Sequence, residues 1–543
     1  MRLISGEHHA EYDVVVVGSG ASGLTTAAVA ARSGLSVIVL EKSSLIGGTS
    51  AVSGGMVWVP NSRQTHPTSD SGSVARAHEY VQAVARGRGN SELMESVVES
   101  GRTALAYLED ECGLDFAALD DFPDYRQDLP GAAIGGRTLE PRLWDTSVLG
   151  GLVDSIRTDG RAPFTMQEYE RWGAFTNFPW EELDERARSG ISAKGHALIG
   201  GLTASCVRDA VAIALDARVA TLRTDDDSRV AGVELEDGTE IAARRGVVLA
   251  TGGFEWDREL TDSLLASRLY AVCSPPSNTG DGLRMAQRIG AKTRGTREAW
   301  WAPMSLAGDT RDGQEIGTLL RFERQGPGSI MVNRHGERFA NESQNYNDLA
   351  RALHSWDPAN NQPLNSPAYI VVDSRYLRLY GLFSHRHGEP TPDYVTEAPT
   401  LDALAAELGI NAAALNATVQ RFNAHAIAGE DPDFQRGESA YDKYWGDNDN
   451  PWPNSSLAPL EEAPYYALPV INGAFGTNGG VATDGNGVVR DVDDNAIEGL
   501  YAVGNVSQSA YAAGYPGAGA TLGPIITVGY LAGIHLANTP EGN

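Results

Sequence analysis

The order of apolar and polar residues at the start of the chain predicts a strand, a helix and a second strand. Residues 12–17 are a nearly continuous β-branched run, typical of a strand buried on both faces of a parallel sheet. A glycine-rich segment at 18–23 follows and opens an alanine-rich stretch, which predicts a helix as far as Arg32. Residues 35–40 predict the second strand, which ends at Glu41. Together these elements form a βαβ unit.

The pattern along the rest of the chain predicts two domains, one inserted into the other. Further strands are expected at 230–235, 246–254 and 487–491, and at 499–505 a strand that runs into a glycine turn. From about residue 296 to residue 464 the sequence becomes rich in Trp, Asn and Pro, and it contains one long helical stretch at 401–425. We therefore predict an α/β protein. A Rossmann-like nucleotide-binding domain is expected from residues 1–295 and 465–543, with an inserted α+β domain at 296–464 that caps the substrate.

Composition and charge narrow the class of protein. The 543 residues carry 71 acidic and 43 basic side chains, for a formal charge of -28. This charge disfavours nucleic acid or an anionic membrane surface as a partner. No uninterrupted apolar run of about 18 residues is present, so no integral membrane segment is expected. The start of the chain lacks the apolar region of a secretory signal, which predicts a cytoplasmic protein; loose membrane association is left open.

Cysteine and histidine positions predict no metal site. Cys112, Cys206 and Cys273 are far apart and odd in number, so they form neither a disulfide framework nor a metal-ligand spacing. His385 and His387 stand two residues apart in a loop that is rich in glycine and proline. Two such histidines are more often solvated side chains than ligands.

The glycine motif after the first strand predicts a dinucleotide site. Gly18, Gly20 and Gly23 follow the Gly-x-Gly-x-x-Gly spacing, which lets backbone N–H groups approach a pyrophosphate. Glu41, about 20 residues further on, can accept hydrogen bonds from ribose hydroxyls. A tight strand-to-helix turn without a ligand is the alternative, but the placement between strand and helix favours the binding site.

Several more glycine elements favour FAD over NAD. Residues 47–55 form a second and third glycine loop, and two others lie at 250–253 and 502–505. An NAD site needs one such element, whereas a longer, extended cofactor uses several. No histidine lies in the 47–55 loop, so we expect FAD to bind non-covalently.

The last glycine-rich segment indicates chemistry beside a ketone. Tyr515 precedes Pro516-Gly-Ala-Gly519, just before an apolar helical stretch at 525–536. A phenol and a free backbone N–H can together stabilise a carbonyl oxygen that gains negative charge.

These motifs resemble the flavoprotein superfamily of fumarate reductases and succinate dehydrogenases, and within it the 3-ketosteroid Δ1-dehydrogenases. The matching pieces are Gly47-Gly-Thr-Ser50, Ser53-Gly-Gly55, Gly195-His-Ala-Leu198, Ala250-Thr-Gly-Gly-Phe254, Asn278-Thr-Gly-Asp-Gly282, residues 328–342, Gly476-Thr-Asn-Gly-Gly480 and the run from Tyr515 to Pro524. The resemblance extends from residue 12 to about residue 535. It implies that the following residues bind FAD: Gly18, Gly20, Ala21, Ser22, Gly23, Glu41, Lys42, Gly48, Thr49, Ser50, Ser53, Gly54, Gly55, Thr251, Gly252, Gly253, Gly504, Asn505, Thr521 and Leu522.

The resemblance also implies four catalytic residues. Tyr515 and the N–H of Gly519 would hold the substrate ketone, Tyr346 would be the general base, and Tyr125 would hydrogen-bond that base. Such an enzyme removes an α-proton while flavin takes hydride from the β-carbon. A phenol has a pKa of about 10, so Tyr346 needs assistance toward phenolate.

The implied function is FAD-dependent α,β-desaturation of a cyclic ketone, with a 3-ketosteroid oxidised at the 1,2 position as the first expectation. A small monocyclic ketone such as cyclohexanone is the alternative, because Trp58, Trp300 and Trp301 could narrow the pocket. A fumarate reductase-like enzyme is disfavoured, since no histidine lies between Tyr465 and Ile534. A non-catalytic scaffold would not need the Tyr515–Gly519 pattern. Reduced FAD would pass its electrons to an external acceptor, a quinone or dioxygen.

Overall fold

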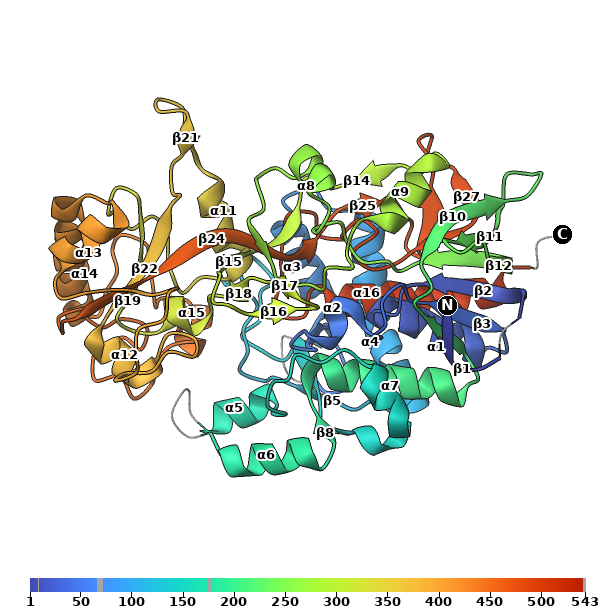
Figure 1. Cartoon of the computed structure of the whole chain (residues 1–543), viewed down its shortest axis with the longest axis horizontal. Helices are drawn as coiled ribbons and strands as arrows, with labels where there is room; N and C mark the ends of the chain where they lie inside the picture. The colour runs from blue at the N-terminus through green and yellow to red at the C-terminus, as the bar shows by residue number, and fades with distance from the viewer. Residues whose placement is uncertain (8, 66–71, 173–177, 541–543) are drawn as a thin grey trace.

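In the computed structural model, which describes residues 1–7, 9–65, 72–172 and 178–540, two large sheets lie side by side (Figure 1). Both termini lie on the side of the larger sheet, and the smaller sheet carries α13 and α14 at the opposite end of the molecule. Segments from the whole length of the chain meet between the two sheets.

The larger sheet has nine strands and a parallel centre. β2 (Glu11–Val17) pairs in parallel with β3 (Val37–Leu40) on one side and with β12 (Glu240–Leu249) on the other. The remaining strands are β1 (Arg2–Ser5), β9 (Ala212–Leu215), β10 (Val219–Thr224), β11 (Val230–Leu235), β26 (Val488–Arg490) and β27 (Ala496–Ala502). The valines of β2 are buried on both faces, as the apolar run predicts.

α1 (Ala21–Arg32) packs against β2 and β3, α7 (Lys194–Arg208) and α16 (Leu522–Asn538) pack against α1, and α4 (Ser91–Cys112) packs against α7 and α16. α1 and α16 cross closely because α16 carries glycines at the contact. A Cβ on Gly533 would lie 2.7 Å from the Val29 side chain, and one on Gly529 would lie 2.8 Å from the Ser22 carbonyl oxygen. This close crossing brings residues at the beginnings of α1 and α16 to the same pocket.

The smaller sheet has seven strands around the 13-residue β24 (Tyr465–Thr477). The others are β13 (Ala271–Val272), β15 (Ala299–Ser305), β18 (Thr318–Leu319), β19 (Ser329–Asn333), β22 (Ala368–Asp373) and β23 (Thr396–Ala398). This sheet therefore takes strands from 296–464 and also β13 and β24 from the flanking sequence.

The expected single helix at 401–425 is wrong, because the structure has two helices there. α13 (Leu401–Leu408) ends at Gly409, whose φ of +67° stops the helix. α14 (Ala412–Ala428) begins after Asn411, whose side chain accepts from the Ala414 N–H. The apolar faces of both helices cover the smaller sheet.

Several shorter elements complete this part of the structure. They are α5 (Met166–Trp172), α10 (Phe322–Gln325), α11 (Tyr346–Arg351) and α15 (Ala440–Tyr444), together with the three-stranded sheet of β4 (Val57–Trp58), β5 (Phe116–Ala118) and β6 (Thr138–Pro141). The other helices are α2 (Gly48–Ala51), α3 (Val74–Ala85), α6 (Trp180–Arg188), α8 (Arg258–Leu264), α9 (Asp281–Arg288) and α12 (Ser374–Tyr380).

Candidate active site

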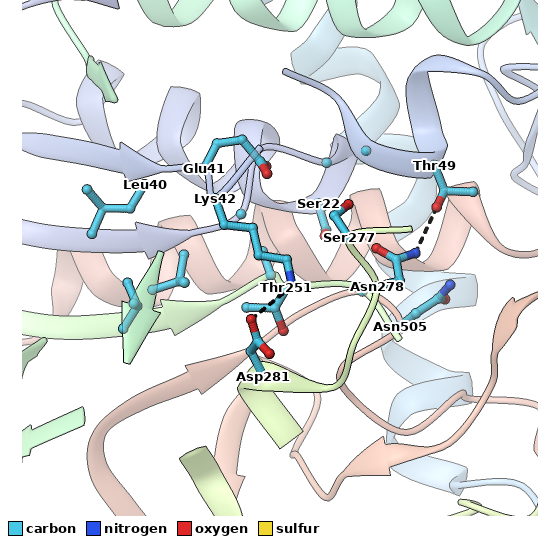
Figure 2. Close-up of a pocket in the computed structure, with 18 of the residues that line it drawn as sticks. Ser22, Leu40, Glu41, Lys42, Thr49, Thr251, Ser277, Asn278, Asp281 and Asn505 are labelled. Atoms are coloured by element: carbon cyan, nitrogen blue, oxygen red, sulfur yellow. Dashed lines mark hydrogen bonds and ion pairs between the residues drawn. The ribbon is translucent and has the colours of Figure 1, made fainter. Parts of the chain in front are cut away.

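A pocket opens at the carboxyl ends of the central parallel strands (Figure 2). Ligands of open α/β sheets bind at this edge. Many of the residues expected to bind FAD line it: Gly18, Gly20, Ala21, Ser22, Glu41, Lys42, Gly48, Thr49, Ser50, Thr251, Gly252, Gly504 and Asn505. The structure thus brings together five separate segments of the chain.

The other expected FAD residues are not among those that line this pocket; they are Gly23, Ser53, Gly54, Gly55, Gly253, Thr521 and Leu522. Two of these glycines allow close backbone packing. A Cβ on Gly23 would lie 2.3 Å from the Gly18 carbonyl oxygen, and one on Gly55 would lie 2.3 Å from the carbonyl carbon of Lys194. Their contact with FAD stays a prediction.

Sequence reasoning missed a charged network at the pocket edge. The Lys42 ammonium donates to Asp281 at 2.9 Å and to the Thr279 hydroxyl at 2.7 Å, and Arg218 donates to both oxygens of Asp281 at 3.0 Å. Although burial opposes ionisation, hydrogen bonds from Arg218 and Lys42 lower the pKa of Asp281 to about 2. Asp281 lies in the motif Asn278–Gly282, so the sequence offered a reason to consider it as a pocket residue. No motif includes Arg218.

The polar groups of the pocket fit FAD. The Thr251 hydroxyl lines the pocket, is buried and has no hydrogen-bond partner among the described residues. α1 has no side-chain N-cap at Gly20. Its Ala21 N–H donates to the Ser50 hydroxyl at 3.2 Å, and the next N–H groups of the first turn meet no side-chain acceptor among the described residues, so they are available to a pyrophosphate. The Glu41 carboxylate accepts from Ser19 and Ser43 and retains acceptor capacity for a ribose hydroxyl.

The predicted catalytic tyrosines meet in one cluster, although they are far apart in the sequence. The hydroxyls of Tyr125 and Tyr346 are 3.3 Å apart. The rings of Tyr125 and Tyr515 stack at 5.4 Å between centroids, and Tyr346 meets Tyr515 edge-on at 5.4 Å. Tyr125 and Tyr515 are 6% and 7% exposed, so solvent is largely excluded from both phenols.

Backbone contacts position these three rings. The Tyr125 N–H donates to the Pro516 carbonyl at 2.8 Å, which ties the 122–125 segment to the turn after Tyr515. Tyr346 is the first residue of α11, whose Arg351 donates to the Ala513 carbonyl at 2.8 Å. Both segments are thereby fixed against the C-terminal glycine turn.

Burial favours the neutral form of the three phenols. It raises the pKa of Tyr125 and Tyr346 well above 10, and it raises the pKa of Tyr515. The nearby hydroxyls of Tyr125 and Tyr515 raise the pKa of Tyr346 further. The expected assistance toward phenolate must therefore outweigh a substantial desolvation cost.

Gly519 has the free N–H that the sequence predicts. Its carbonyl accepts from Trp58 at 3.1 Å and from Gly523 at 2.8 Å, but its own N–H has no partner in the part of the chain that the structure describes. Its φ is +87°, and a Cβ would lie 2.6 Å from the backbone of Val57. Only glycine fits here.

Of the three tryptophans considered for the pocket wall, one lies at the tyrosine cluster. Trp300 meets Tyr515 edge-on at 5.1 Å, and its indole N–H donates to Asn505 at 3.1 Å. Trp58 donates to the buried Asp124, and Trp301 packs on His354. Trp58 and Trp301 are both 0% exposed and belong to the core.

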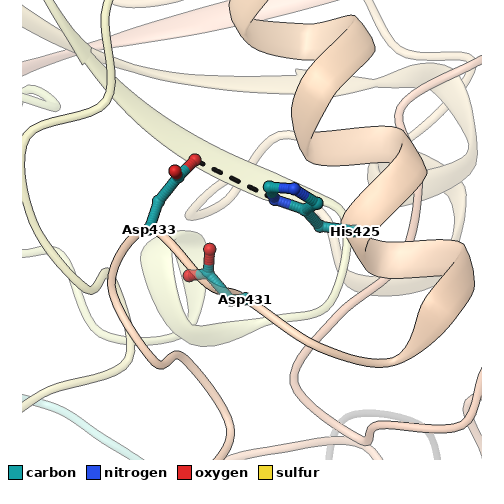
Figure 3. Close-up of side chains that lie close together, drawn as sticks. All are labelled: His425, Asp431 and Asp433. Carbon is teal, nitrogen blue, oxygen red and sulfur yellow. Dashed lines mark ion pairs between the residues drawn. The ribbon is translucent and has the colours of Figure 1, made fainter.

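A separate group consists of His425, in the last turn of α14, and of Asp431 and Asp433 in the segment that follows (Figure 3). Asp431 accepts from both terminal nitrogens of Arg338, at 3.0 and 2.9 Å, and Asp433 pairs with Arg421 at 3.1 Å. Because guanidinium groups already neutralise both carboxylates, ion pairing explains this group without a metal.

Comparison with known proteins places the chain. The family model described as an FAD binding domain matches residues 13–522. The chain belongs to this FAD-binding family. Within the family, it is 62% identical to 4-oxocyclohexanecarboxylate 2-dehydrogenase of Sinomonas cyclohexanicum over all of this chain and 96% of the relative. It is 34% identical to 3-oxosteroid 1-dehydrogenase of Mycobacterium tuberculosis over 97% of this chain and 98% of the relative.

A solved structure agrees in fold. The 3-ketosteroid Δ1-dehydrogenase of Sterolibacterium denitrificans, crystallised with 1,4-androstadiene-3,17-dione, matches 97% of this chain and 100% of its own, with 34% identity and a TM-score of 0.90. The resemblance, the α/β fold, FAD as cofactor and the assignment as an FAD-dependent dehydrogenase are confirmed. In the described ranges of the chain, no helix has the length and apolar character needed to cross a bilayer.

Proposed function

We propose that this dehydrogenase introduces a C=C bond beside the ketone of a substituted cyclohexanone, with 4-oxocyclohexanecarboxylate as substrate. The observation that carries the reaction is the convergence of Tyr125 and Tyr346 on Tyr515, which stands in the same glycine turn as Gly519, whose N–H has no partner among the described residues. The substrate is argued from the 62% identity to a dehydrogenase of that name over the whole chain.

Polarisation of the ketone is assigned to Tyr515 and Gly519. The Tyr515 hydroxyl, now 3.2 Å from the Thr521 hydroxyl, and the Gly519 N–H would both donate to the ketone oxygen. Preorganised donors stabilise the negative charge that this oxygen gains as the α-proton leaves, and removal of one such donor costs roughly 10²–10³ in kcat.

Proton removal is assigned to the Tyr346 oxygen. As a phenolate it takes the α-proton, and the Tyr125 hydroxyl donates to it across the observed 3.3 Å. FAD, when bound in the neighbouring pocket, supplies the acceptor for the hydride that leaves the adjacent carbon. Reoxidation by a quinone or dioxygen is part of the proposal, because three separated cysteines cannot hold a four-cysteine iron–sulfur cluster.

A second candidate is 1,2-dehydrogenation of a 3-ketosteroid. The structural match to the Sterolibacterium steroid enzyme at a TM-score of 0.90 favours it. The ketone-binding groups serve both substrates, so the two candidates differ in the size and polarity of the remaining substrate.

Anaerobic titration of the flavin tests the proposal. The purified yellow protein is mixed in separate cuvettes with 4-oxocyclohexanecarboxylate, cyclohexanone and 4-androstene-3,17-dione, and the visible flavin band is followed. We expect bleaching by the carboxylated ketone with a 2-ene product. Bleaching by the steroid alone would move the assignment to the second candidate. If none of the three bleaches a flavin that dithionite reduces, the proposed reaction is wrong.

A further inference from the structure

The guanidinium of Arg321, the residue before α10, has no counterion among the residues that the structure describes. Its guanidinium carbon lies 5.6 Å from the Trp445 ring and 5.9 Å from the Phe322 ring. Within the described ranges, its side chain makes no ion pair and no hydrogen bond, although the chain has far more acidic than basic residues. The nearby Glu323 carboxylate is used by the N–H groups of Arg321 and Phe383.

Lys194, the first residue of α7, is a second cation in this region, close enough to Arg321 for the two charges to interact. Its ammonium lies 3.4 Å from the centroid of the Phe164 ring, and it has no hydrogen bond or ion pair to any residue that the structure describes. Burial, and then the positive charges of Arg161 and Arg321, lower the pKa of Lys194 to about 7. The Lys194 backbone has φ of +59°, a costly conformation for a non-glycine residue.

The carboxylates that face Lys194 are engaged elsewhere. Glu140 accepts from the backbone N–H groups of Met166 and Gln167 at 2.5 and 2.9 Å. Asp159 pairs with Arg161 at 3.2 Å. The ammonium therefore lacks a direct carboxylate contact from either of them.

Tyr169 of α5 adds an unsatisfied hydroxyl. This side chain is 8% exposed, and its hydroxyl is buried without a hydrogen-bond partner among the described residues. Its ring stacks on Phe322 at 5.7 Å and lies 6.4 Å from Phe164. The positive charge of Arg321 acts to lower the pKa of Tyr169, but burial raises that pKa by more.

We propose that Arg321, Lys194 and Tyr169 form an anion site that binds the carboxylate of the substrate and thereby selects a carboxylated ring over a neutral one. The side chains of these three residues pack against one group of aromatic rings, those of Phe164, Phe322 and Trp445. None of their polar groups has a hydrogen-bond or ion-pair partner among the described residues. A buried donor without an acceptor is costly, and a carboxylate supplies several acceptor positions at once. We name these three residues the anion cluster.

The anion cluster adjoins the tyrosines proposed to act on the ketone. Trp445 follows α15, whose Tyr441 packs on Tyr125 at 4.9 Å. The positive charge of Arg321 acts to lower the pKa values of Tyr125 and Tyr441, whereas burial raises them. In 4-oxocyclohexanecarboxylate the carboxylate and the ketone stand at opposite ends of one six-membered ring. This inference rests on the proposed function, and it adds the groups that bind the carboxylate end of the substrate.

Arg321→Gln and Tyr169→Phe test the anion cluster in the FAD-loaded enzyme. KM and kcat are measured with 4-oxocyclohexanecarboxylate and with its neutral carboxamide. We expect Arg321→Gln to raise KM for the acid by roughly 10- to 100-fold, the range for loss of a hydrogen bond to a charged group, and to leave the carboxamide within about threefold. Tyr169→Phe should act in the same direction and less strongly, and Arg321→Lys should restore part of the affinity.

Arg378→Gln is the matched control, because Arg378 is a surface arginine paired with Glu462. This variant should leave KM and kcat unchanged for both the acid and the carboxamide. Flavin content and calorimetric binding of cyclohexanecarboxylate, which lacks the ketone, are read for every variant. Loss of cyclohexanecarboxylate binding in Arg321→Gln with full flavin content would support the site without reference to turnover.

Two results would overturn the inference. One is an equal loss for acid and carboxamide in Arg321→Gln, which would assign Arg321 a general role toward the tyrosines. The other is a wild-type enzyme that handles acid and carboxamide equally well, which would leave the proposed desaturation standing. A wild-type enzyme that binds cyclohexanecarboxylate through Arg321 but desaturates no ketone would instead refute the reaction and keep the anion site.

Discussion

Replacing Tyr346 by phenylalanine removes one oxygen atom from the tyrosine cluster and leaves the ring in place. The ring centroid lies 5.0 Å from that of Phe475 and 5.4 Å from that of Tyr515, and phenylalanine keeps both ring contacts. The lost hydrogen bond to Tyr125 is long, at 3.3 Å, so the free energy of unfolding should fall by about 1 kcal/mol or less. The FAD pocket is not lined by Tyr346, so flavin content should not change.

The loss of rate should be far larger than the loss of stability. A positioned general base contributes roughly 10²–10⁴-fold, so anaerobic flavin reduction by the ketone in Tyr346→Phe should slow by that factor. Stopped-flow measurement of the flavin band gives this rate directly. Exchange of the α-proton in D₂O, followed by NMR, should slow in parallel, because the same oxygen removes that proton.

Tyr270→Phe is the control, because this tyrosine is 54% exposed and lies outside the cluster. Flavin reduction within about threefold of wild type in Tyr346→Phe, with normal flavin content, would refute the assignment of Tyr346 as base. A large fall in both flavin content and melting temperature would show instead that the hydroxyl is structural.

Three other predictions follow from the same site. Because burial raises the pKa of Tyr346 well above 10, the phenolate fraction should grow about tenfold per pH unit, so flavin reduction should still accelerate between pH 7 and 9; a plateau below pH 8 would contradict this. Gly519→Ala should lower the free energy of unfolding by about 1–3 kcal/mol and reduce kcat, since its Cβ would meet the Val57 backbone; unchanged thermal melting would contradict it. The pKa of Asp281 is depressed to about 2, so its ion pairs should contribute about 2 kcal/mol above pH 4 that is lost as pH falls toward 2; urea unfolding of wild type and Asp281→Asn from pH 7 to 3 should show this difference shrink.

Local features of the sequence predicted many of the residues that line the pocket at the strand ends. The apolar run, the glycine spacing and Glu41 are contiguous, and each follows from the geometry of one βαβ unit. The break between α13 and α14 was also present locally, as Gly409 and the capping Asn411, but the apolar periodicity on both sides obscured it.

The position of Tyr515 beside the glycine turn could be seen in the sequence, but its contacts could not. Tyr125 lies 390 positions before it and reaches it through the Pro516 carbonyl, while Tyr346 arrives from α11. Only the resemblance to a family suggested that these residues act together.

The anion cluster carried no sequence signal, since Lys194, Tyr169 and Arg321 stand in unrelated segments. A cation is recognised as unpaired only when its neighbours in space are known. The sequence alone determined the nucleotide-binding strands, the glycine turns and the chemical types available for catalysis, because these depend on neighbours within a few residues. The tertiary structure decided which tyrosines meet, which hydroxyls and cations lack partners and which glycines cannot be replaced, because burial and close contact are set by segments that are distant along the chain.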